Sequence, residues 1–468
     1  MAMFWQLEKH AENQALIDEQ GCTFSYGDLA EACRQLEPYL PASGLVFILC
    51  RNTVAALVGY LACLRKGAVP LLLDADLDPQ RLRSLAETYH PGLIWQPMAA
   101  GSAPVWQWRD YQLIATRLTP YPLHRDLALL MTTSGSTGSP KLVRLSRRNL
   151  QCNADSIKQY LALDATERPL VHLPLHYVYG LSIVNSHLLA GATLVMTTQS
   201  VMQREFWQGI ERNQVTSLSG VPYTWEMLHR LRFSRMSLPS LRTLTQAGGK
   251  LSPALHQHFA DYARQNDKQF VVMYGAAEAT SRMAWLPAEQ AVEKCGAIGQ
   301  AIPGGQLFLK DDQGELIVQP AVQGELCYRG ENVMMGYASS GDDLACGDQL
   351  HGELLTGDLA VFDEQGCFTV VGRKKRFLKI FGNRVGLDEM EMLLKNRFSG
   401  LACACIGRDD RLTIVLTDPD LQNEVLRYAA QSTRLHPSAF RFRIVPAIPL
   451  TATGKTHYER LNEDDAGI

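Results

Sequence analysis

The stretch TTSGSTGSPK, residues 132–141, gathers hydroxyl side chains, glycines, a proline and a lysine in one short segment. It follows the apolar run DLALLM (126–131), which predicts a buried strand. Glycines let backbone N–H groups approach an anion, hydroxyls donate hydrogen bonds, and lysine adds positive charge. A strand followed by such a loop therefore predicts phosphate binding.

The spacing of this loop excludes the phosphate loop of nucleotide hydrolases. That motif requires four residues between its glycines and a Gly-Lys-Ser/Thr ending. Here two residues separate Gly135 from Gly138, and a proline precedes Lys141. An ordinary Ser/Gly turn remains the alternative for this loop taken alone.

Length and composition narrow the class of protein. A chain of 468 residues is too long for one compact core and indicates two or more domains. The net charge of −3 does not favour a nucleic-acid or acidic-membrane partner. No apolar run reaches the roughly 18 residues that span a bilayer, and the first residues lack the order of a signal peptide. The 11 cysteines are scattered without a C-x-x-C pair. They indicate reduced core thiols, so we expect a cytoplasmic enzyme.

Apolar runs alternate with segments of helical period through the first three quarters of the chain. One helical segment follows Ser146, which we expect to cap it. The alternation is typical of α/β proteins with mostly parallel sheets. Besides residues 126–131, the strand-like runs are GLVFILC (44–50), AVPLLLDAD (68–76), PLVHLPL (169–175), ATLVMTT (192–198), QVTSLSGVP (214–222), LRTLTQAGG (241–249) and QFVVMYG (269–275).

From about residue 295, short β-like pieces and glycine turns replace this alternation, and a basic run, GRKKRFLK (372–379), precedes a final α+β pattern. We therefore predict an α/β fold with its domain boundary at the basic run. A large N-terminal domain of mostly parallel sheets flanked by helices, with a small β subdomain, covers 1–371. A hinge follows at 372–375, and a small α+β domain covers 376–468.

Four further segments could contact a nucleotide. MYGAAEAT (273–280) closes a strand with an aromatic, a glycine and an acid, and LLTGDLA (354–360) places Asp358 in a predicted tight turn. VGRKKRFLKIFGNRV (371–385) is rich in basic residues, and PLTATGKTHY (449–458) sets a lysine after a glycine.

With these five motifs in this order, the chain resembles the adenylate-forming superfamily of acyl-CoA synthetases, peptide-synthetase adenylation domains and luciferases. The resemblance covers nearly the whole chain. It implies that a carboxylic acid is activated with ATP to an acyl-adenylate, with release of pyrophosphate. The acyl group then passes to a thiol of coenzyme A or of a carrier protein's phosphopantetheine arm.

The resemblance assigns most of the nucleotide site. Glu278 is expected to bind Mg²⁺, as hard carboxylate oxygens do. Tyr274 with Gly275 would lie on one side of adenine and Gly248 with Gly249 on the other. Asp358 would accept from the ribose hydroxyls, with Arg373 as a second ribose contact. The β- and γ-phosphates would be held by Thr133, Ser134, Gly135, Ser136, Thr137, Gly138 and Lys141.

Three basic residues receive roles from the resemblance. Lys455 would bridge the carboxylate and the α-phosphate, where negative charge develops. Lys375 would be the pivot about which the small, mobile C-terminal domain rotates. Arg384 would lie near phosphate or thiol.

The segment LPLHYVYGLSIVN (173–185) resembles the strip that lines the acyl pocket, with Gly180 and Gly220 in the same pocket. Tyr177, preceded by His176, is expected to be an aromatic gate. Amino-acid-activating relatives carry an aspartate where this chain has Val178. A buried ammonium without a counter-charge is costly, so we expect an acid without an α-amine. Fatty, aryl and short branched acids remain open.

The sequence departs from the family pattern at Ala277, where a threonine is usual. Some fatty acyl-adenylate ligases share the alanine, so activity remains the expectation. The alternatives are a non-catalytic nucleotide-binding or regulatory protein on the same scaffold, an amino-acid-adenylating enzyme, or a luciferase-like oxygenase. Single residues also have structural alternatives. Glu278 could be an acid at a helix N-terminus, and Asp358 could close an Asx-turn. Lys455 could be a solvated surface lysine, Tyr177 could serve packing, and the basic run 373–379 could be a solvated face.

Overall fold

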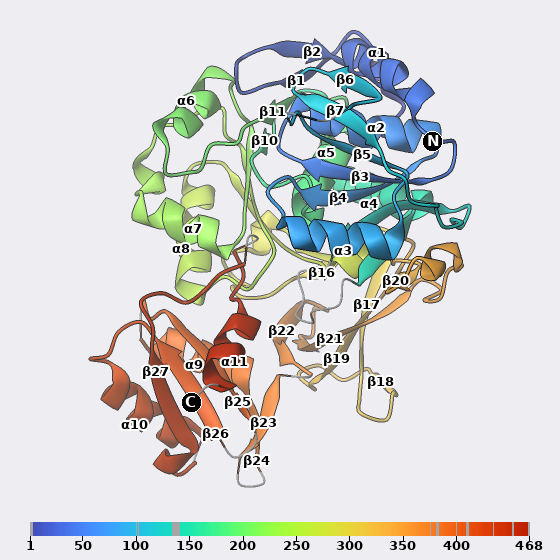
Figure 1. The fold of residues 1–468 in the computed structure, drawn as a ribbon. Coiled ribbons are helices and arrows are strands. Elements are labelled where there is room, and N and C mark those ends of the chain that lie inside the picture. The colour runs from blue at the N-terminus through green and yellow to red at the C-terminus, as the bar shows by residue number, and fades with distance from the viewer. Residues whose placement is uncertain are drawn as a thin grey trace.

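The computed structural model describes residues 3–99, 101, 103–132, 141–374, 376–380, 383–398, 400–408, 411–433, 435–451 and 454–466. Figure 1 shows a large N-terminal part, drawn blue to yellow, and a smaller C-terminal part, drawn orange to red, on one side of it.

An eight-stranded sheet forms the centre of the N-terminal part. Parallel pairing is confined to its middle, β8–β4–β3–β5, and both edges are antiparallel. The strands in spatial order are β20 (Gly336–Ala338), β9 (Leu142–Ser146), β8 (Leu127–Thr132), β4 (Val69–Asp74), β3 (Leu45–Cys50), β5 (Leu93–Pro97), β7 (Tyr111–Ala115) and β6 (Trp106–Trp108).

Two further mixed sheets complete the α/β part. The first runs β12 (Ser217–Gly220), β13 (Thr243–Gln246), β14 (Gln269–Tyr274), β15 (Ala284–Leu286) and β16 (Gln300–Ala301). The second runs β10 (Leu170–Val171), β11 (Leu194–Met196), β1 (Gln14–Ile17) and β2 (Thr23–Ser25). The α/β prediction is confirmed, with the difference that the sheets are mixed: hairpins, which need only short connections, supply antiparallel edges.

Helices cover these sheets, and their beginnings follow local signals. Ser146 forms a capping box with Asn149 at the start of α4, as expected, and Thr53 caps α2. The helices are α1 (Tyr26–Leu36), α2 (Val54–Lys66), α3 (Pro79–Tyr89), α4 (Arg147–Tyr160), α5 (Val178–Ala190), α6 (Arg204–Arg212), α7 (Pro222–Arg230) and α8 (Pro253–Gln265).

The apolar run 169–175 yields only a two-residue strand, β10. Pro174, four residues after Leu170, has no backbone N–H to donate to a neighbouring strand. The carbonyl of Pro174 instead accepts from Tyr177 N at 3.0 Å, where the chain turns into α5. This early turn brings residues 173–177 to the end of the sheet rather than into it.

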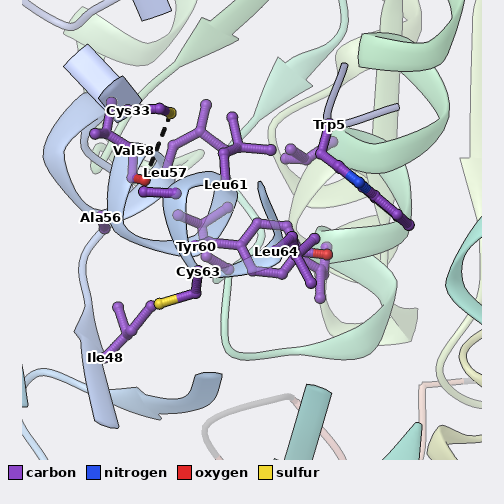
Figure 2. Packing of buried hydrophobic residues seen from close by; sticks show 14 of the residues in the cluster. Trp5, Cys33, Ile48, Ala56, Leu57, Val58, Tyr60, Leu61, Cys63 and Leu64 are labelled. Atoms are coloured by element: carbon purple, nitrogen blue, oxygen red, sulfur yellow. Dashed lines mark hydrogen bonds between the residues drawn. The ribbon is translucent and has the colours of Figure 1, made fainter. Parts of the chain in front are cut away.

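The interior around α2 shows how the N-terminal core is packed. Every residue from Val54 to Leu64 is buried, so this helix is apolar on all sides. Figure 2 shows Leu57, Tyr60 and Leu61 among the side chains of this cluster, with the Cys33 thiol 3.8 Å from the Val58 carbonyl oxygen. A helix buried on all sides makes this part of the molecule a rigid base for the loops at its sheet edges.

A separate antiparallel sheet follows, made of β18 (Leu316–Ile317), β17 (Gly305–Lys310), β19 (Gly324–Gly330), β21 (Glu353–Phe362) and β22 (Phe368–Arg373). It corresponds to the predicted short β pieces and lies next to the C-terminal part in Figure 1. Its last strand ends at the basic run.

The C-terminal part has the predicted α+β pattern. Its buried apolar residues pack in clusters that include no residue before Leu378. Cys403 and Cys405 face one cluster and Ala404 and Ile406 the other, so this strand is buried on both faces. The elements are β23 (Phe377–Ile380), β24 (Asn383–Gly386), α9 (Leu387–Arg397), β25 (Cys403–Arg408), β26 (Arg411–Leu416), α10 (Gln422–Thr433), β27 (Phe440–Ile444) and α11 (Tyr458–Ala466).

All 11 cysteines are free thiols, seven of them buried. Within the described residues, no helix is both long and apolar enough to cross a membrane.

Candidate active site

The carboxyl ends of two parallel neighbours, β13 and β14, form the edge at which the predicted adenine residues meet. Gln246 lies opposite Val272 in this pairing, so the Gly248–Gly249 turn and Tyr274 leave the sheet side by side. The Gln246 side-chain amide donates to the Gly249 carbonyl at 2.7 Å and holds the turn. Crevices at such strand ends are the usual ligand sites of open α/β sheets.

Asp358 is the centre of a short hydrogen-bonded chain. Its Oδ2 accepts from the Tyr274 hydroxyl at 2.5 Å, and its Oδ1 lies 3.1 Å from Nε of Arg373. The pKa of Tyr274 is raised well above its usual value by burial and by the Asp358 carboxylate. Tyr274, Asp358 and Arg373 are thus brought together, although up to 99 positions separate them in the sequence, as their numbers show.

The prediction that Asp358 lies in a tight turn is wrong. Asp358 lies within β21, opposite Arg373 of β22, and its side chain is buried. Gly357, at φ 71°, and a register shift between Leu359 and Ala360 mark a bulge here, which turns the carboxylate toward Tyr274. The Asx-turn alternative fails as well, because the carboxylate is bonded to residues on other strands.

Lys455 belongs to a short turn that touches the N-terminal part. Thr451 N donates to the Lys455 carbonyl at 2.7 Å, and Lys455 N donates to Thr451 Oγ1 at 3.1 Å. A Cβ added to Gly454 would lie 3.0 Å from Val221 Cγ2, just before α7. Figure 1 shows the C-terminal chain rising toward α7.

The charges that act on Lys455 indicate which groups lie near its ammonium. Its pKa is lowered chiefly by burial and further by the positive charge of Arg373, while Glu278 and Asp358 oppose the decrease. The ammonium therefore lies within electrostatic reach of all three groups. The turn brings together charges from four segments of the chain.

Glu278 lies in a single 3-10 turn (Ala277–Ala279) after β14, and its Oε1 accepts from the Tyr337 hydroxyl at 2.7 Å. The exposed Lys141 ammonium lies 5.9 Å from the centre of the Tyr337 ring. Tyr337 was not singled out by sequence; it lies on the edge strand β20, and nothing local in its segment links it to Glu278. In the described part of the chain, no cluster of three or more His, Cys, Asp or Glu could hold a metal.

Tyr177 begins α5 and reaches the adenine-side turn. A Cβ added to Gly248 would lie 2.5 Å from the Tyr177 hydroxyl, so only glycine fits there, at φ 84°. The pKa of Tyr177 is raised by burial and by Tyr179. The hydroxyl thus lies where the predicted acyl and nucleotide residues meet.

The other predicted pocket residues lie in the surrounding framework. His176 Nε2 is 3.8 Å from Asp74, and burial lowers the pKa of His176 although Asp74 opposes this. Val178 packs in the apolar clusters beneath α5. A Cβ on Gly180 would lie 2.4 Å from the Pro174 carbonyl, and one on Gly220 would lie 2.9 Å from Trp225 Nε1. Both glycines therefore allow close packing of the protein against itself, and their predicted substrate contact stays a prediction.

Tight packing also explains Gly275. A Cβ there would lie 1.7 Å from the Ser281 carbonyl oxygen, because the chain crosses back over this residue after Glu278. No larger residue could stand at this position without moving the strand β14.

Several predicted residues lie outside the described part of the chain. They are Thr133, Ser134, Gly135, Ser136, Thr137, Gly138 and Lys375, and for Arg384 only the backbone, in β24, is described. The strands on either side of 133–140 are described and pair antiparallel, with Thr132 opposite Leu142.

A second ionic cluster lies just beyond the basic run. Arg376 contacts Asp388 and pairs with Glu391 at 3.0 Å, and its guanidinium carbon lies 3.7 Å from the centre of the Tyr458 ring. The pKa of Asp388 is raised by burial, against the effect of Arg376, and it also responds to the charge of Arg373. Nothing local in the sequence marks this cluster, because its members are up to 82 positions apart, as their numbers show.

Known proteins resemble this chain in sequence and in fold. The chain is 28% identical over 476 residues to 2-succinylbenzoate–CoA ligase of Bacillus pumilus, covering 96% of this chain and 95% of that protein. It is 30% identical over 415 residues to feruloyl-CoA synthase of an Amycolatopsis species, covering 83% and 82%. The solved structure of o-succinylbenzoate CoA synthetase from Bacillus subtilis, in complex with its acyl-adenylate intermediate, has a TM-score of 0.79, with 22% identity and 98% coverage of both chains.

Residues 3–338 match the family described as AMP-binding enzyme, and this match includes Tyr177, Gly248, Tyr274 and Glu278. The chain belongs to the AMP-binding enzyme family.

Proposed function

We propose that this protein activates a carboxylic acid without an α-amine, using ATP. The product is an acyl-adenylate, pyrophosphate is released, and the acyl group then passes to a thiol of coenzyme A or of a carrier protein's phosphopantetheine. The observation that carries the proposal is the position of Lys455, from the C-terminal part, within electrostatic reach of Glu278, Asp358 and Arg373. A protein that only binds a nucleotide has no need of this fourth group.

The roles of the nucleotide residues follow from their contacts. The Asp358 carboxylate is buried yet bonded through only one hydroxyl and one guanidinium, so it can accept from ribose hydroxyls. The Arg373 side chain is 63% exposed beside it and can reach the same sugar. Adenine would lie between Tyr274 and the Gly248–Gly249 turn, which leave the sheet side by side.

The phosphates would be held by residues 133–138 and Lys141, and Mg²⁺ by Glu278. The donor set fits this ion: the Glu278 carboxylate accepts from Tyr337, whose ring centre lies 5.9 Å from the Lys141 ammonium. The described residues form no complete protein cage around the carboxylate. Mg²⁺ is usually held by one or two carboxylates together with substrate phosphates and water. When bound, it would supply charge neutralisation to the triphosphate.

Lys455 would act in the first chemical step. A carboxylate oxygen attacks the α-phosphate, the bond to pyrophosphate breaks, and negative charge develops on the α-phosphate oxygens. An ammonium held between acid and phosphate stabilises that charge and orients the attacking carboxylate. Burial keeps the Lys455 charge poorly screened, which strengthens its effect there.

The preference for an amine-free acid rests on Val178. This residue packs in apolar clusters at the start of α5, where a carboxylate would be needed to pair with an α-ammonium. An unpaired ammonium in such surroundings would lose its hydration without compensation.

We further propose that the chain divides into domains at 1–371 and 376–468, with a hinge at 372–375 about Lys375. The separate apolar clusters after Leu378 support independent movement of the C-terminal part. Adenylation needs Lys455 over the carboxylate, whereas thiol attack needs that side open. One rigid arrangement cannot serve both steps.

The test is pyrophosphate release from ATP across a panel of fatty, aryl, short branched and amino acids, with and without coenzyme A. Release with an amine-free acid, and thioester formation with coenzyme A or a phosphopantetheine carrier, are expected. ATP binding with no release for any acid would support a regulatory protein instead. Release with α-amino acids alone would contradict the role given to Val178.

A further inference from the structure

Arg282 is a fully buried cation beside the predicted acyl residues. The chain passes from Glu278 through Thr280, which is buried at φ 65°, and then crosses over Gly275. This crossing turns the next side chain inward, and Arg282 is only 2% exposed. Sequence analysis did not single it out, because a lone arginine in TSRMAW is usually a surface residue.

All the described partners of Arg282 are electrically neutral. Its Nε donates to Ser182 Oγ at 3.2 Å, and its Nη1 donates to the Tyr160 hydroxyl at 3.0 Å and to the Met273 sulfur at 2.8 Å. Its guanidinium carbon lies 5.1 Å from the centre of the Tyr179 ring. Within the described residues, Arg282 forms no ion pair with Asp or Glu.

Two other arginines in the same chain show how buried guanidinium groups are usually satisfied. Arg144, 0% exposed, donates to a ring of oxygen atoms that includes the Met335 and Gly347 carbonyls and Gln349 Oε1. Arg376 is neutralised by Asp388 and Glu391. Arg282 has neither arrangement, although an unpaired buried charge is strongly unfavourable.

The position of Arg282 connects this unpaired charge to the site. Tyr179 lies 5.1 Å from the guanidinium and 6.2 Å, ring to ring, from Tyr177, whose hydroxyl touches the Gly248 turn. Met273 directly precedes Tyr274 on β14. The Tyr179 ring therefore links the guanidinium to Tyr177, beside which the acyl group is proposed to bind.

From this geometry we infer that Arg282 pairs with a second carboxylate at the far end of the acyl substrate, so that the preferred substrate is a dicarboxylic acid. This inference rests on the proposed function, since it names the class of acid that the same site activates. One carboxylate is adenylated near Lys455, and the other supplies the counter-charge that no described residue provides. A fork of N–H donors is well suited to a carboxylate.

The experiment compares matched acids in the pyrophosphate-release assay. Each dicarboxylic acid, such as adipate, suberate or an aryl diacid, is paired with its mono-methyl ester and with the monocarboxylic acid of equal length. For wild type, kcat/KM is expected to be about 10- to 100-fold higher for the diacid, the range given by a charge-assisted hydrogen bond. In Arg282→Met the preference should disappear through a rise in KM for the diacid, while KM for ATP stays within about twofold.

Two control variants separate substrate recognition from structure. Arg329→Met removes the same charge from an exposed pair with Glu353 and should keep the preference. Arg282→Lys retains a charge and should keep part of it. Thermal unfolding adds a second measurement: a diacid with AMP should raise the Tm of wild type more than its methyl ester does, and Arg282→Met should lose this difference.

The outcomes distinguish this inference from the proposed function. If wild type releases pyrophosphate with monocarboxylic acids as well as or better than with diacids, the inference is wrong and the proposed function stands. If no acid of either class supports release, both fall. If Arg282→Met does not fold, the wild-type preference and the Arg282→Lys variant still decide the question.

Discussion

The nucleotide side and the acyl side of the site treat charge differently. On the nucleotide side, Asp358 lies against Arg373 and Tyr274, and Glu278 accepts from Tyr337. On the proposed acyl side, the described partners of Arg282 are only a hydroxyl, a phenol, a thioether and a ring. The first set of charges is paired among described residues of the protein, whereas the second would be completed by the proposed diacid. Under this proposal, the difference in pairing is what selects the substrate.

The largest effect is expected from Lys455→Ala, which removes the movable charge of the nucleotide side. Loss of one charge that stabilises the transition state should slow adenylation about 100-fold, or about 3 kcal/mol. Adenylate formation should be measured directly, in a single turnover. An unchanged rate would show that the balance of charges around Asp358 suffices without Lys455.

The acyl side should be the more sensitive to acid. His187 of α5 is buried, and burial lowers its pKa to about 4, an effect to which Arg282 adds. The pKa of His187 is lower in the folded protein than in the unfolded chain, so the unfolded chain binds a proton more readily. His187 thus stabilises the fold fully above about pH 6.5, and this contribution, about 3 kcal/mol, is lost as the pH falls toward 4.

Thermal unfolding of wild type and of His187→Gln between pH 7.5 and pH 4.5 would measure this contribution. The variant should lose less stability on acidification than wild type. The exposed His351→Gln is the matched control and should behave as wild type. Equal pH dependence in all three proteins would mean that the acyl side tolerates a second positive charge.

Asp358→Asn tests the nucleotide side, where the charges are paired, and keeps the shape of the side chain. It removes the charge that faces Arg373 and weakens the proposed acceptor for ribose. The KM for ATP should rise about 10- to 30-fold, since hydrogen bonds to charged groups contribute about 1.5–3 kcal/mol. Stability should change little, because the Arg373 side chain is 63% exposed. An unaltered KM for ATP would exclude Asp358 from nucleotide binding, and Asp420→Asn serves as an exposed control.

The smallest effect concerns the boundary between the two sides. A Cβ in Gly248→Ala would lie 2.5 Å from the Tyr177 hydroxyl but 3.8 Å from the ring carbon that carries it. The substitution should lower kcat/KM for the acid about tenfold, of which roughly 1 kcal/mol comes from positive φ. Adding Tyr177→Phe should restore part of the loss. If the double variant is no better than Gly248→Ala alone, Tyr177 is not the residue that fixes this turn.

Much of the fold could be predicted because its signals are local. Ser146 and Thr53 are caps whose side chains bond within their own helices. The alternation of apolar strands and helices, and the α+β pattern after the basic run, also depend on neighbouring residues. The sequence motifs of the site are local signals too, because each is a short segment with its own composition.

What the sequence alone determined is therefore the fold class, the order of the motifs and the AMP-binding resemblance, because runs of adjacent residues carry them. Tertiary structure decided the rest: that Asp358 lies in a bulged strand against Tyr274, that Tyr337 faces Glu278, and that Arg282 is buried without an acid among the described residues. Each of these depends on groups on separate elements. Electrostatic and packing energies act through space, so only the folded arrangement shows which charges are paired and which are left for a ligand.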